Sequence, residues 1–519
     1  MKVRTLFAIC LTALAGAAVW ALPAQAAETF YWSNYGSNSL AFANLDGSGG
    51  GGFDSAGQEV VGSEGLAIDS ASGRLYWANF TNGSDTGAIR YAGLGGGDGG
   101  QLNTGGANVD EPAGVAIDPT TRTIYWTNYG GGDEDNGTIS WARLDGSGAG
   151  DLNAAGATVL SPEAIAVDPS GGKVYWSNED DTISYANLDN SGGGGKFNVS
   201  GASAPDGVTG IAVDSDRGRI YWLNNGSSES VSYANLGGGG GGDFDYGSAS
   251  LNGPYGLTLD PTSGKLYWGN YGNDEEKTGV FGFLSVGGGP NGGINIASAP
   301  VDGPQNPVIL KGPSGTGAPT VTRTAKTTAL SCSQGTWAED AGGAFYYQAP
   351  KDYVYQWNLN GVPIVGANAP TYAAQGPGAY SCTVTGLNHN GSASQTSGAL
   401  ALRAGKLSLG LRKHKAQVKA GKKPGVYRLV VNNSGDFSIA AAQLCVKVPK
   451  KARKALKKPK CRRIANLVAH KKRTVKVRLK AKKNARGTYK VRFLLRGKGG
   501  AKPVKAKLAV RPQKKKRKG

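Results

Sequence analysis

The chain has 519 residues, of which 84 are glycine, and its 57 Lys and Arg against 37 Asp and Glu give a formal net charge of +20. This length allows about two to four domains, and the glycine lacks the Gly-X-Y period of collagen. After the N-terminal leader, no stretch approaches the roughly 20 apolar residues that a transmembrane helix needs. Composition therefore predicts a multidomain protein with no transmembrane segment.

The N-terminus has the composition of a secretory signal peptide. Lys2 and Arg4 precede an apolar run over residues 6–22, and Ala24–Ala26 supplies the small residues of a cleavage site. We therefore expect residues 1–26 to be removed and the mature protein to be secreted or held at the cell surface.

The dipeptide Tyr-Trp recurs six times between residues 31 and 268, and Asn follows each Trp two residues later. The copies are 45, 49, 50, 46 and 46 residues apart. Within one unit, Pro112–Asp118, Thr123–Asn128 and Thr138–Gly146 are apolar or aromatic runs separated by turn residues, which predicts β-strands. Three or four short strands in each period are typical of a propeller blade.

The sequence also predicts how the ring closes. Blade one begins at Thr29 without the strand that opens the other units, and a matching segment, Gly303–Leu310, follows the sixth unit. We expect that segment to complete blade one and to cover its edge. A fourth, weaker strand is expected in the Gly-rich stretch before the next Pro, for example at Ala157–Leu160, with the glycine runs as flexible hairpin connections.

This pattern resembles the YWTD repeats of the low-density-lipoprotein receptor (class B repeats), which form six-bladed β-propellers. The resemblance covers roughly residues 29–310, with Tyr-Trp-x-Asn in place of Tyr-Trp-Thr-Asp at all six sites. It implies a six-bladed propeller over residues 27–312. The EGF-like module usual in that family is not visible, so receptor-like ligands are not carried over. Five upstream aspartates also match the pattern: Asp69, Asp118, Asp168, Asp214 and Asp260.

Residues that recur in every blade are expected to be framework, whereas a binding site is expected among residues that differ between blades, especially on loops. The most divergent loops are acidic and follow the Tyr-Trp-x-Asn strands, which places them at one end of the propeller. A cation or a basic partner could bind there, or the loops could be solvated hairpin tips. Their acidic residues are Asp133, Glu134, Asp135, Glu179, Asp180, Asp181, Asp274, Glu275 and Glu276.

A different pattern begins after the repeats, over residues 313–403. Four cysteines remain after the leader, and of the three possible pairings the domain layout favours Cys332–Cys382 and Cys445–Cys461. Cys332, Trp357, Tyr380 and Cys382 follow the order of an immunoglobulin-like sandwich. The segment resembles bacterial Ig-like domains, which implies that Trp357 packs on the disulfide and that Tyr380 forms a tyrosine corner. Such a domain is usually a spacer or an adhesion module, and we expect a spacer here.

Residues 404–519 hold 40 of the Lys and Arg residues and one acid, Asp436, so this segment carries +39 while the rest of the chain carries −19. Thr474–Lys482 and Tyr489–Phe493 alternate apolar and basic residues, which predicts half-buried strands with basic outer faces. Residues 404–511 resemble small bacterial sandwich domains of the CARDB-like kind, and residues 512–519 are expected to be a Lys-rich tail.

Three interpretations of this charge remain open. The segment could bind an anionic cell-wall polymer or acidic polysaccharide, it could keep strand edges soluble, or it could bind nucleic acid. Nucleic acid is disfavoured because few aromatic side chains and no reading motif accompany the charge. The candidate polyanion-binding residues are Lys471, Lys472, Arg473, Lys476, Arg478 and Lys480.

The sequence thus predicts an all-β chain made of a six-bladed β-propeller and two β-sandwich domains. Its three histidines, His389, His414 and His470, all lie after the repeats, so a histidine-based catalytic or zinc site in the propeller is not expected. We expect an exported binding or adhesion protein without cofactor, metal or catalytic residues. Its propeller is expected to display a face that binds an unknown protein or glycan ligand. The alternative is a secreted propeller hydrolase or lyase that acts on a glycan or lactone through carboxylates.

Overall fold

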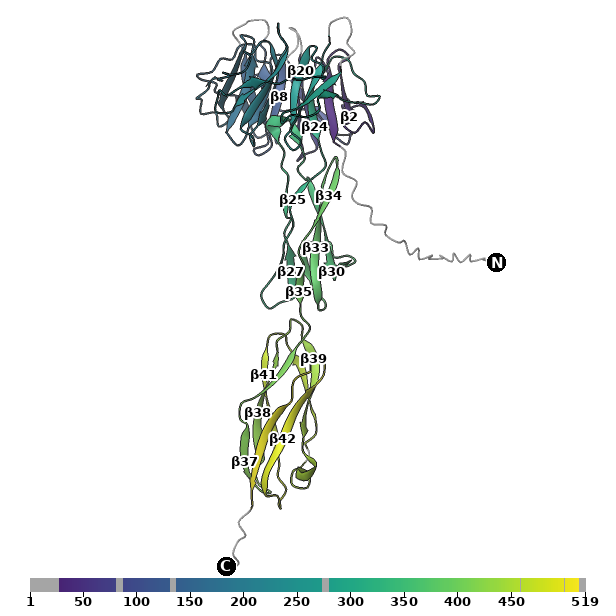
Figure 1. Cartoon of the computed structure of the whole chain (residues 1–519), viewed down its shortest axis with the longest axis vertical. Helices are drawn as coiled ribbons and strands as arrows, with labels where there is room; N and C mark the ends of the chain where they lie inside the picture. The colour runs from purple at the N-terminus through teal and green to yellow at the C-terminus, as the bar shows by residue number, and fades with distance from the viewer. Residues whose placement is uncertain are drawn as a thin grey trace, which may run out of the picture. The chain divides into compact units, whose positions relative to one another are not determined.

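The structure is a computed structural model that describes residues 28–80, 87–130, 137–272, 280–457, 459–498 and 500–512. The expected signal peptide and residues 513–519 of the expected tail lie outside these ranges. Among the described residues the fold is all-β, and its helical elements are two single 3-10 turns. The predicted fold class, a six-bladed propeller and two β-sandwiches, is confirmed (Figure 1).

The chain forms two compact units. The first contains the chain up to Ser314 together with Ala338–Asp352 and Gly386–Ala393. The second contains Gly315–Trp337, Tyr353–Thr385 and the chain from Ser394 onward. Two segments from the middle of the sequence therefore fold with the propeller.

Each blade is a four-stranded antiparallel sheet whose strands follow one another from the central channel outward. Blade one contains β24 (Pro304–Leu310), β1 (Thr29–Asn34), β2 (Ser39–Asn44) and β3 (Gly50–Gly52). Blade two contains β4 (Leu66–Asp69), β5 (Arg74–Asn79), β6 (Ala88–Gly93) and β7 (Gly99–Gln101). Blade three contains β8 (Pro112–Asp118), β9 (Thr123–Asn128), β10 (Thr138–Arg143) and β11 (Ala149–Asp151).

The remaining blades repeat this order. Blade four contains β12 (Ile165–Asp168), β13 (Lys173–Asn178), β14 (Thr182–Asn187) and β15 (Gly195–Lys196). Blade five contains β16 (Val208–Asp214), β17 (Arg219–Asn224), β18 (Ser230–Asn235) and β19 (Gly242–Asp243). Blade six contains β20 (Pro254–Asp260), β21 (Lys265–Asn270), β22 (Phe281–Ser285) and β23 (Gly292–Gly293). The antiparallel pairing of β1 with β24 confirms the predicted ring closure.

The repeated residues are framework. The Trp of every Tyr-Trp dipeptide is wholly buried, and in blade three its indole Nε1 donates a hydrogen bond to the carbonyl oxygen of Asn108, 3.0 Å away. The aspartate that ends each inner strand from blade two to blade six holds the following turn. Asp118, for example, accepts from the backbone N–H of Thr120 and from the Thr121 hydroxyl.

The asparagine of the repeat ties its strand to the connection before it. Asn128 Oδ1 accepts from the backbone N–H of Asp110 at 3.0 Å, and its Nδ2 donates to the carbonyl oxygen of Asn108 at 3.2 Å. Asn79 and Asn270 make the same pair of contacts in their blades. An ionised aspartate has no donor for that carbonyl oxygen, which explains why this chain carries Asn at the last position of the motif.

The outermost strands lie within the glycine-rich stretches, where a fourth strand was expected, but two details of the prediction were wrong. Ala157–Leu160 is not a strand, and the glycine runs are not simply flexible connections. The reason is contact with the third strand of the blade. A Cβ added at Gly100 would lie 2.7 Å from Tyr91 Oη, and one at Gly242 would lie 2.8 Å from Tyr233 Oη. Glycine lets the outer strand cover these rings.

The segment Ala338–Asp352, which we call the channel plug, closes the end of the channel at which the inner strands finish. Its 3-10 turn η1 (Gly342–Ala344) lies against β8, β12, β16 and β20. The strand β29 (Tyr346–Tyr347) then pairs in parallel with β24, and both tyrosines are fully buried. Asp340 fixes the loop by accepting from the backbone N–H groups of Gln348 and Ala349.

The first sandwich of the second unit has three small sheets, β25-β28, β26-β27-β32 and β31-β30-β33-β34, with β35 paired to β33. Its strands are β25 (Gly315–Gly317), β26 (Val321–Arg323), β27 (Ala329–Cys332), β28 (Thr336–Trp337), β30 (Asp352–Leu359), β31 (Val362–Pro363), β32 (Thr371–Ala373), β33 (Gly378–Asn388), β34 (Gly391–Thr396) and β35 (Leu400–Leu402). The predicted disulfide Cys332–Cys382 is present. Trp357 is fully buried, and the Tyr380 hydroxyl donates to the carbonyl oxygen of Gly376 at 2.7 Å.

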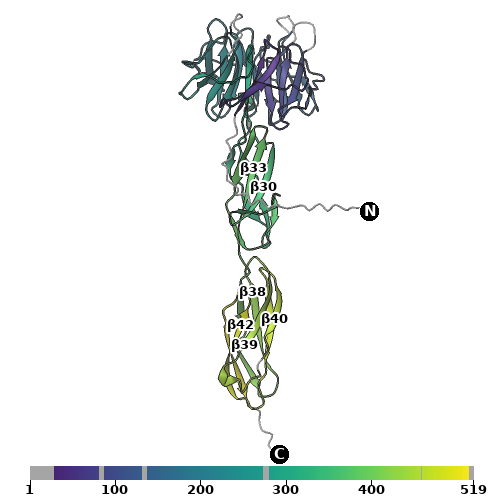
Figure 2. The ribbon, with the colours of Figure 1, turned by 90° about the vertical axis from the view of Figure 1, so that its right-hand side faces the viewer.

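The C-terminal sandwich packs a three-stranded sheet, β36-β38-β41, against a five-stranded sheet, β37-β43-β42-β39-β40. Figure 2 shows the neighbouring strands β42, β39 and β40. The predicted disulfide Cys445–Cys461 is present in this domain. The elements are β36 (Leu407–Leu411), β37 (Lys415–Lys419), β38 (Gly425–Asn433), β39 (Ile439–Lys447), η2 (Lys450–Ala452), β40 (Arg462–Leu467), β41 (Lys472–Leu479), β42 (Gly487–Arg496) and β43 (Val504–Arg511).

Candidate functional site

The open end of the propeller channel carries one blade-specific residue from each blade, located in or just before its inner strand. Gln305 and Tyr255 stand opposite the third residue of Tyr-Trp-x-Asn in their blades, and the backbone N–H of Glu163 bonds the equivalent residue in blade four. The sequence places three more residues at the same position of the repeat. We call these six residues the mouth ring: Glu64, Ala113, Glu163, Thr209, Tyr255 and Gln305.

Below the mouth ring the channel is blind, and it is lined by apolar side chains and by Asn306. One side chain from each blade forms this layer, and Phe345 of the channel plug closes it from below. The cavity left between them is about 10 Å³, which is room for about one water molecule. The apolar layer consists of Leu66, Val115, Ile165, Ile211, Leu257 and Pro307.

Two glutamates of the mouth ring act on each other electrostatically. Burial, repulsion from Glu163 and the nearby charge of Glu111 raise the pKa of Glu64 to about 8. Burial raises the pKa of Glu163 to about 7, although the hydroxyl of Tyr255 donates a hydrogen bond to its carboxylate. At neutral pH this pair therefore holds a proton that ordinary glutamates would have lost.

A second ring, which we call the aromatic collar, surrounds the mouth. It consists of the residues that directly follow Tyr-Trp-x-Asn, four of which are the half-buried aromatics Tyr35, Phe80, Tyr129 and Tyr271. Tyr35 and Tyr271 meet edge to face with ring centroids 6.0 Å apart, and Phe80 and Tyr129 do so at 6.1 Å. Burial and the charge of Glu64 raise the pKa of Tyr35, which places the collar beside the mouth ring.

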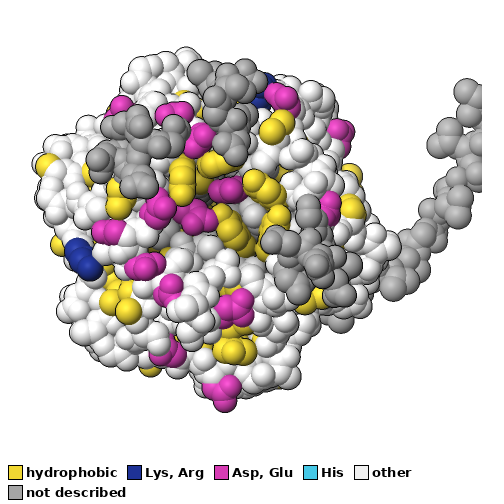
Figure 3. Space-filling model, turned by 90° about the horizontal axis from the view of Figure 1, so that it is seen from above, with side chains coloured by type: hydrophobic (Ala, Val, Ile, Leu, Met, Phe, Trp, Pro, Cys, Tyr) yellow, Lys and Arg dark blue, Asp and Glu magenta, His cyan; other side chains and the backbone are white. Residues whose placement is uncertain are grey.

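This face of the propeller is acidic. Figure 3 shows Asp and Glu side chains gathered around its centre next to hydrophobic ones, with few Lys or Arg. Among the described residues, no salt bridge pairs Glu64, Glu111 or Glu163 with a cation. The described part of the chain also contains no group of three or more His, Cys, Asp or Glu placed to hold a metal ion.

The predicted acidic loops are only partly described. Six of their nine residues lie outside the described ranges, namely Asp133, Glu134, Asp135, Asp274, Glu275 and Glu276. Of the other three, Asp180 accepts from Thr182 within its own turn, and Asp181 accepts from the backbone N–H of Gly207 in the connection that leads to blade five. Glu179 occupies the collar position of blade four.

The mouth ring was not predicted from the sequence. Its signal was present, because the residue before the Gly-Leu-Ala-Ile-Asp type of strand changes from blade to blade while its neighbours repeat. His389 was also not expected near the repeats, yet it folds with the propeller unit beside Gly73, at the end opposite the mouth ring. Burial and the charge of Lys351 lower the pKa of His389.

A second site lies on the C-terminal sandwich. All six predicted polyanion-binding residues are exposed, but the structure does not bring them together on one face. Lys472, Lys476, Arg478 and Lys480 follow the alternation of edge strand β41 and form what we call the β41 stripe. Lys471 precedes the strand. Arg473 has the opposite parity along β41 from the β41 stripe, and its guanidinium donates to the carbonyl oxygen of Ala465.

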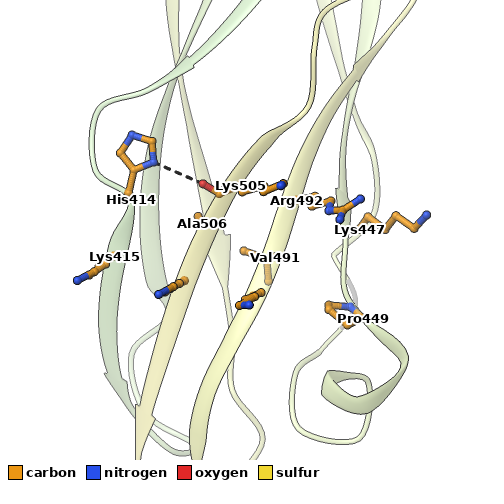
Figure 4. Close-up of a pocket in the computed structure, with 10 residues that line it drawn as sticks. His414, Lys415, Lys447, Pro449, Val491, Arg492, Lys505 and Ala506 are labelled. Atoms are coloured by element: carbon orange, nitrogen blue, oxygen red, sulfur yellow. Dashed lines mark hydrogen bonds between the residues drawn. The ribbon is translucent and has the colours of Figure 1, made fainter.

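A denser group of cations lies on the five-stranded sheet and was not predicted. Its register forms two rows: Lys415, Lys507 and Lys490 lie across three strands, and Lys505, Arg492 and Lys447 form the next row. We call these six residues the cation grid. They line a groove of about 620 Å³, and Figure 4 shows Lys415, Lys505, Arg492 and Lys447 on four neighbouring strands around it.

The cation grid has no acid to neutralise it. Asp436 is the single carboxylate of residues 404–519, and it is engaged by Arg323 at 2.9 Å and Arg403 at 3.5 Å. Neighbouring strands stand about 4.8 Å apart and alternate residues about 7 Å apart along a strand. The grid therefore presents positive charge at a spacing that suits repeating anions.

No protein-family model and no curated protein matches the chain. Solved propeller structures are similar to it in fold. A putative TolB of Agrobacterium tumefaciens is 13% identical, covers 53% of this chain and 93% of its own length, and gives a TM-score of 0.36. A gluconolactonase of Xanthomonas campestris is 17% identical, with coverages of 47% and 84% and a TM-score of 0.32. A putative 6-phosphogluconolactonase of Bacteroides fragilis is 15% identical, with coverages of 55% and 98% and a TM-score of 0.37. No activity is carried over from these likenesses.

Proposed function

We propose that the chain is an exported binding protein that attaches to an anionic polymer of the cell envelope through its C-terminal sandwich and presents its propeller as a ligand-binding face. The cation grid is the observation that carries this proposal. Export is supported by the signal-peptide composition and by two disulfides, which persist in oxidising compartments. No helix in the described ranges has the length and apolarity to cross a membrane.

Solubility alone explains the cation grid poorly. A soluble surface intersperses both signs of charge, and a small domain needs a net charge of only about 2–8, whereas residues 404–519 carry +39. Six cations on adjacent strands with no carboxylate among them repel one another. Such an arrangement is costly unless an anionic partner neutralises it.

The proposal is tested by neutralising four cations in either of two places on the full chain. One variant carries Lys490→Gln, Arg492→Gln, Lys505→Gln and Lys507→Gln in the cation grid, and its matched control carries Lys472→Gln, Lys476→Gln, Arg478→Gln and Lys480→Gln in the β41 stripe. Binding to isolated cell envelopes is measured as salt is raised. We expect the grid variant to bind roughly 100-fold more weakly at about 0.1 M salt, with a salt slope lower by about one per cation removed.

The control is expected to change affinity by less than about threefold, because both variants lose the same net charge and only the grid is a compact array. Equal losses in the two variants would show that net charge is sufficient. Binding of the parent chain that does not depend on salt would contradict attachment through charge.

A hydrolase remains the second candidate function, because the mouth ring holds two carboxyl groups of raised pKa. A neutral carboxylic acid can serve as general acid beside a carboxylate base or nucleophile. Turnover of a glycan or lactone by the full chain that is abolished by Glu163→Gln would favour this function over binding alone.

A further inference from the structure

The mouth ring holds three side chains with hydrogen-bond acceptors, and the described residues satisfy these acceptors only in part. Glu64 and Glu163 present carboxylates without a cationic partner. Gln305 occupies the same position in blade one, is only 3% exposed, and its Oε1 is buried with no hydrogen-bond partner. A buried acceptor left unpaired costs free energy, so a rotation of the Gln305 amide that brings this oxygen to a donor at the mouth is favoured.

Apart from the amide N–H groups of Gln305, the mouth ring contributes little donor capacity of its own. The Tyr255 hydroxyl has one proton, and it is donated to Glu163. The other two residues of the mouth ring are Ala113, which has no polar side-chain atom, and Thr209, whose hydroxyl donates to the carbonyl oxygen of Pro254. Three acceptors around one opening therefore match a ligand with several N–H donors and a positive charge.

The surroundings fit an aliphatic cation. The aromatic collar places the rings of Tyr35, Phe80, Tyr129 and Tyr271 around the opening, and aromatic faces attract ammonium groups. The channel below is lined by apolar side chains and Asn306 and is closed by Phe345, so the ligand binds at the mouth and does not pass through. A primary ammonium has three donors and no acceptor, so it can donate to Glu64, to the remaining acceptor capacity of Glu163 and to Gln305.

We infer that the mouth ring binds a primary ammonium group on an aliphatic chain, held by Glu64, Glu163 and Gln305. The source is either a small free amine or the lysine side chain of a partner. The inference rests on the proposed ligand-binding face of the propeller and does not depend on polymer attachment, so failure of either experiment leaves the other result standing.

Titration of the full chain with n-butylammonium chloride tests the inference by calorimetry at several pH values. The groups that face the carboxyl pair are Glu111, Glu179, Tyr35, Tyr129 and Tyr255. Because the ligand requires ionised carboxylates, we expect affinity to rise about tenfold between about pH 6 and 8.5, with release of protons on binding. Glu163→Gln and Glu64→Gln are each expected to weaken binding at least tenfold.

Asp216→Asn is the matched control, because it removes an exposed carboxylate that lies beyond the far end of β16, and it should bind as the parent does. The unfolding transition of each variant verifies its fold. Nα-acetyl-lysine amide distinguishes the sources: binding as tight as that of n-butylammonium identifies a lysine side chain, and much weaker binding identifies a small amine.

Three results would overturn the inference. They are no saturable binding of n-butylammonium at pH 8.5, unchanged affinity in both glutamine variants, and equal binding of n-butanol. Tetramethylammonium, which has the charge but no N–H donor, should bind more weakly than n-butylammonium. Equal binding of the two cations would contradict the role of Gln305 and the carboxylates as hydrogen-bond acceptors.

Discussion

Gly343→Ala is expected to destabilise the propeller by about 3 kcal/mol or more, because the channel plug is seated with no space for a side chain. A Cβ at this position would lie 2.0 Å from the carbonyl oxygen of Val167 and 3.1 Å from Val213 Cβ. Val167 belongs to β12, which is paired with β13 and cannot retreat without breaking blade four. The variant must therefore strain the inner strands or release the plug.

Chemical denaturation followed by tryptophan fluorescence measures this effect, since the propeller contains six wholly buried Trp side chains. Gly52→Ala is the matched control, because a Cβ at Gly52 on the outer strand of blade one would meet nothing within 4 Å. We expect the control to change the free energy of unfolding by less than about 1 kcal/mol. A Gly343→Ala variant as stable as the control would show that the plug is not held in the channel.

The stability of the propeller is expected to fall as pH rises from about 4.5 to 8 because of the mouth ring. In the folded chain the pKa of Glu64 is raised to about 8 and that of Glu163 to about 7, from an ordinary value of 4.5. Below 4.5 both groups are protonated whether the chain is folded or not, so their contribution is fully present. Above it the unfolded chain releases protons that the folded chain retains, and the contribution is lost.

After a discount for partial exposure to water, the pair should cost about 3 kcal/mol of stability between pH 5 and 9. The double variant Glu64→Gln, Glu163→Gln removes both titrations, so it should match the parent at pH 5 and exceed its stability at pH 9. Denaturant unfolding at the two pH values measures the difference, with Asp216→Asn as the control. A parent and a double variant that lose equal stability between pH 5 and 9 would contradict the raised pKa values.

The sequence predicted the parts of the fold that rest on periodic local patterns. The spacing of the Tyr-Trp-x-Asn copies predicts six blades. The additional inner-strand segment Gly303–Leu310 predicts the ring closure, in which β24 pairs with β1. The cysteine positions were sufficient for both disulfides. The outermost strands were expected but were not placed correctly, because glycine has little strand propensity of its own and these strands depend on the rings of the third strand, such as Tyr91.

The sites depend on distances in the fold that no local pattern contains. In the sequence, the channel plug stands between strands of the first sandwich, although it folds with the propeller. Its local signal was the aromatic run Phe345, Tyr346 and Tyr347 in a glycine-rich loop. To predict the mouth ring, one position of the repeat must be compared between all six blades. Glu64 and Glu163 stand at this position in two blades, whereas blade three has Ala113. The cation grid requires strand order, since Lys415 lies beside Lys507 although 92 positions separate them.

The most direct test of the attachment proposal is the reactivity of individual lysines toward acetylation, with the full chain free and bound to isolated cell envelopes. The account predicts that Lys415, Lys447, Lys490, Lys505 and Lys507 lose reactivity on binding, while Lys472, Lys476 and Lys480 of the β41 stripe and Lys173 and Lys265 of the propeller keep theirs. Protection of the β41 stripe with an unprotected cation grid, or uniform protection of all exposed lysines, would contradict it.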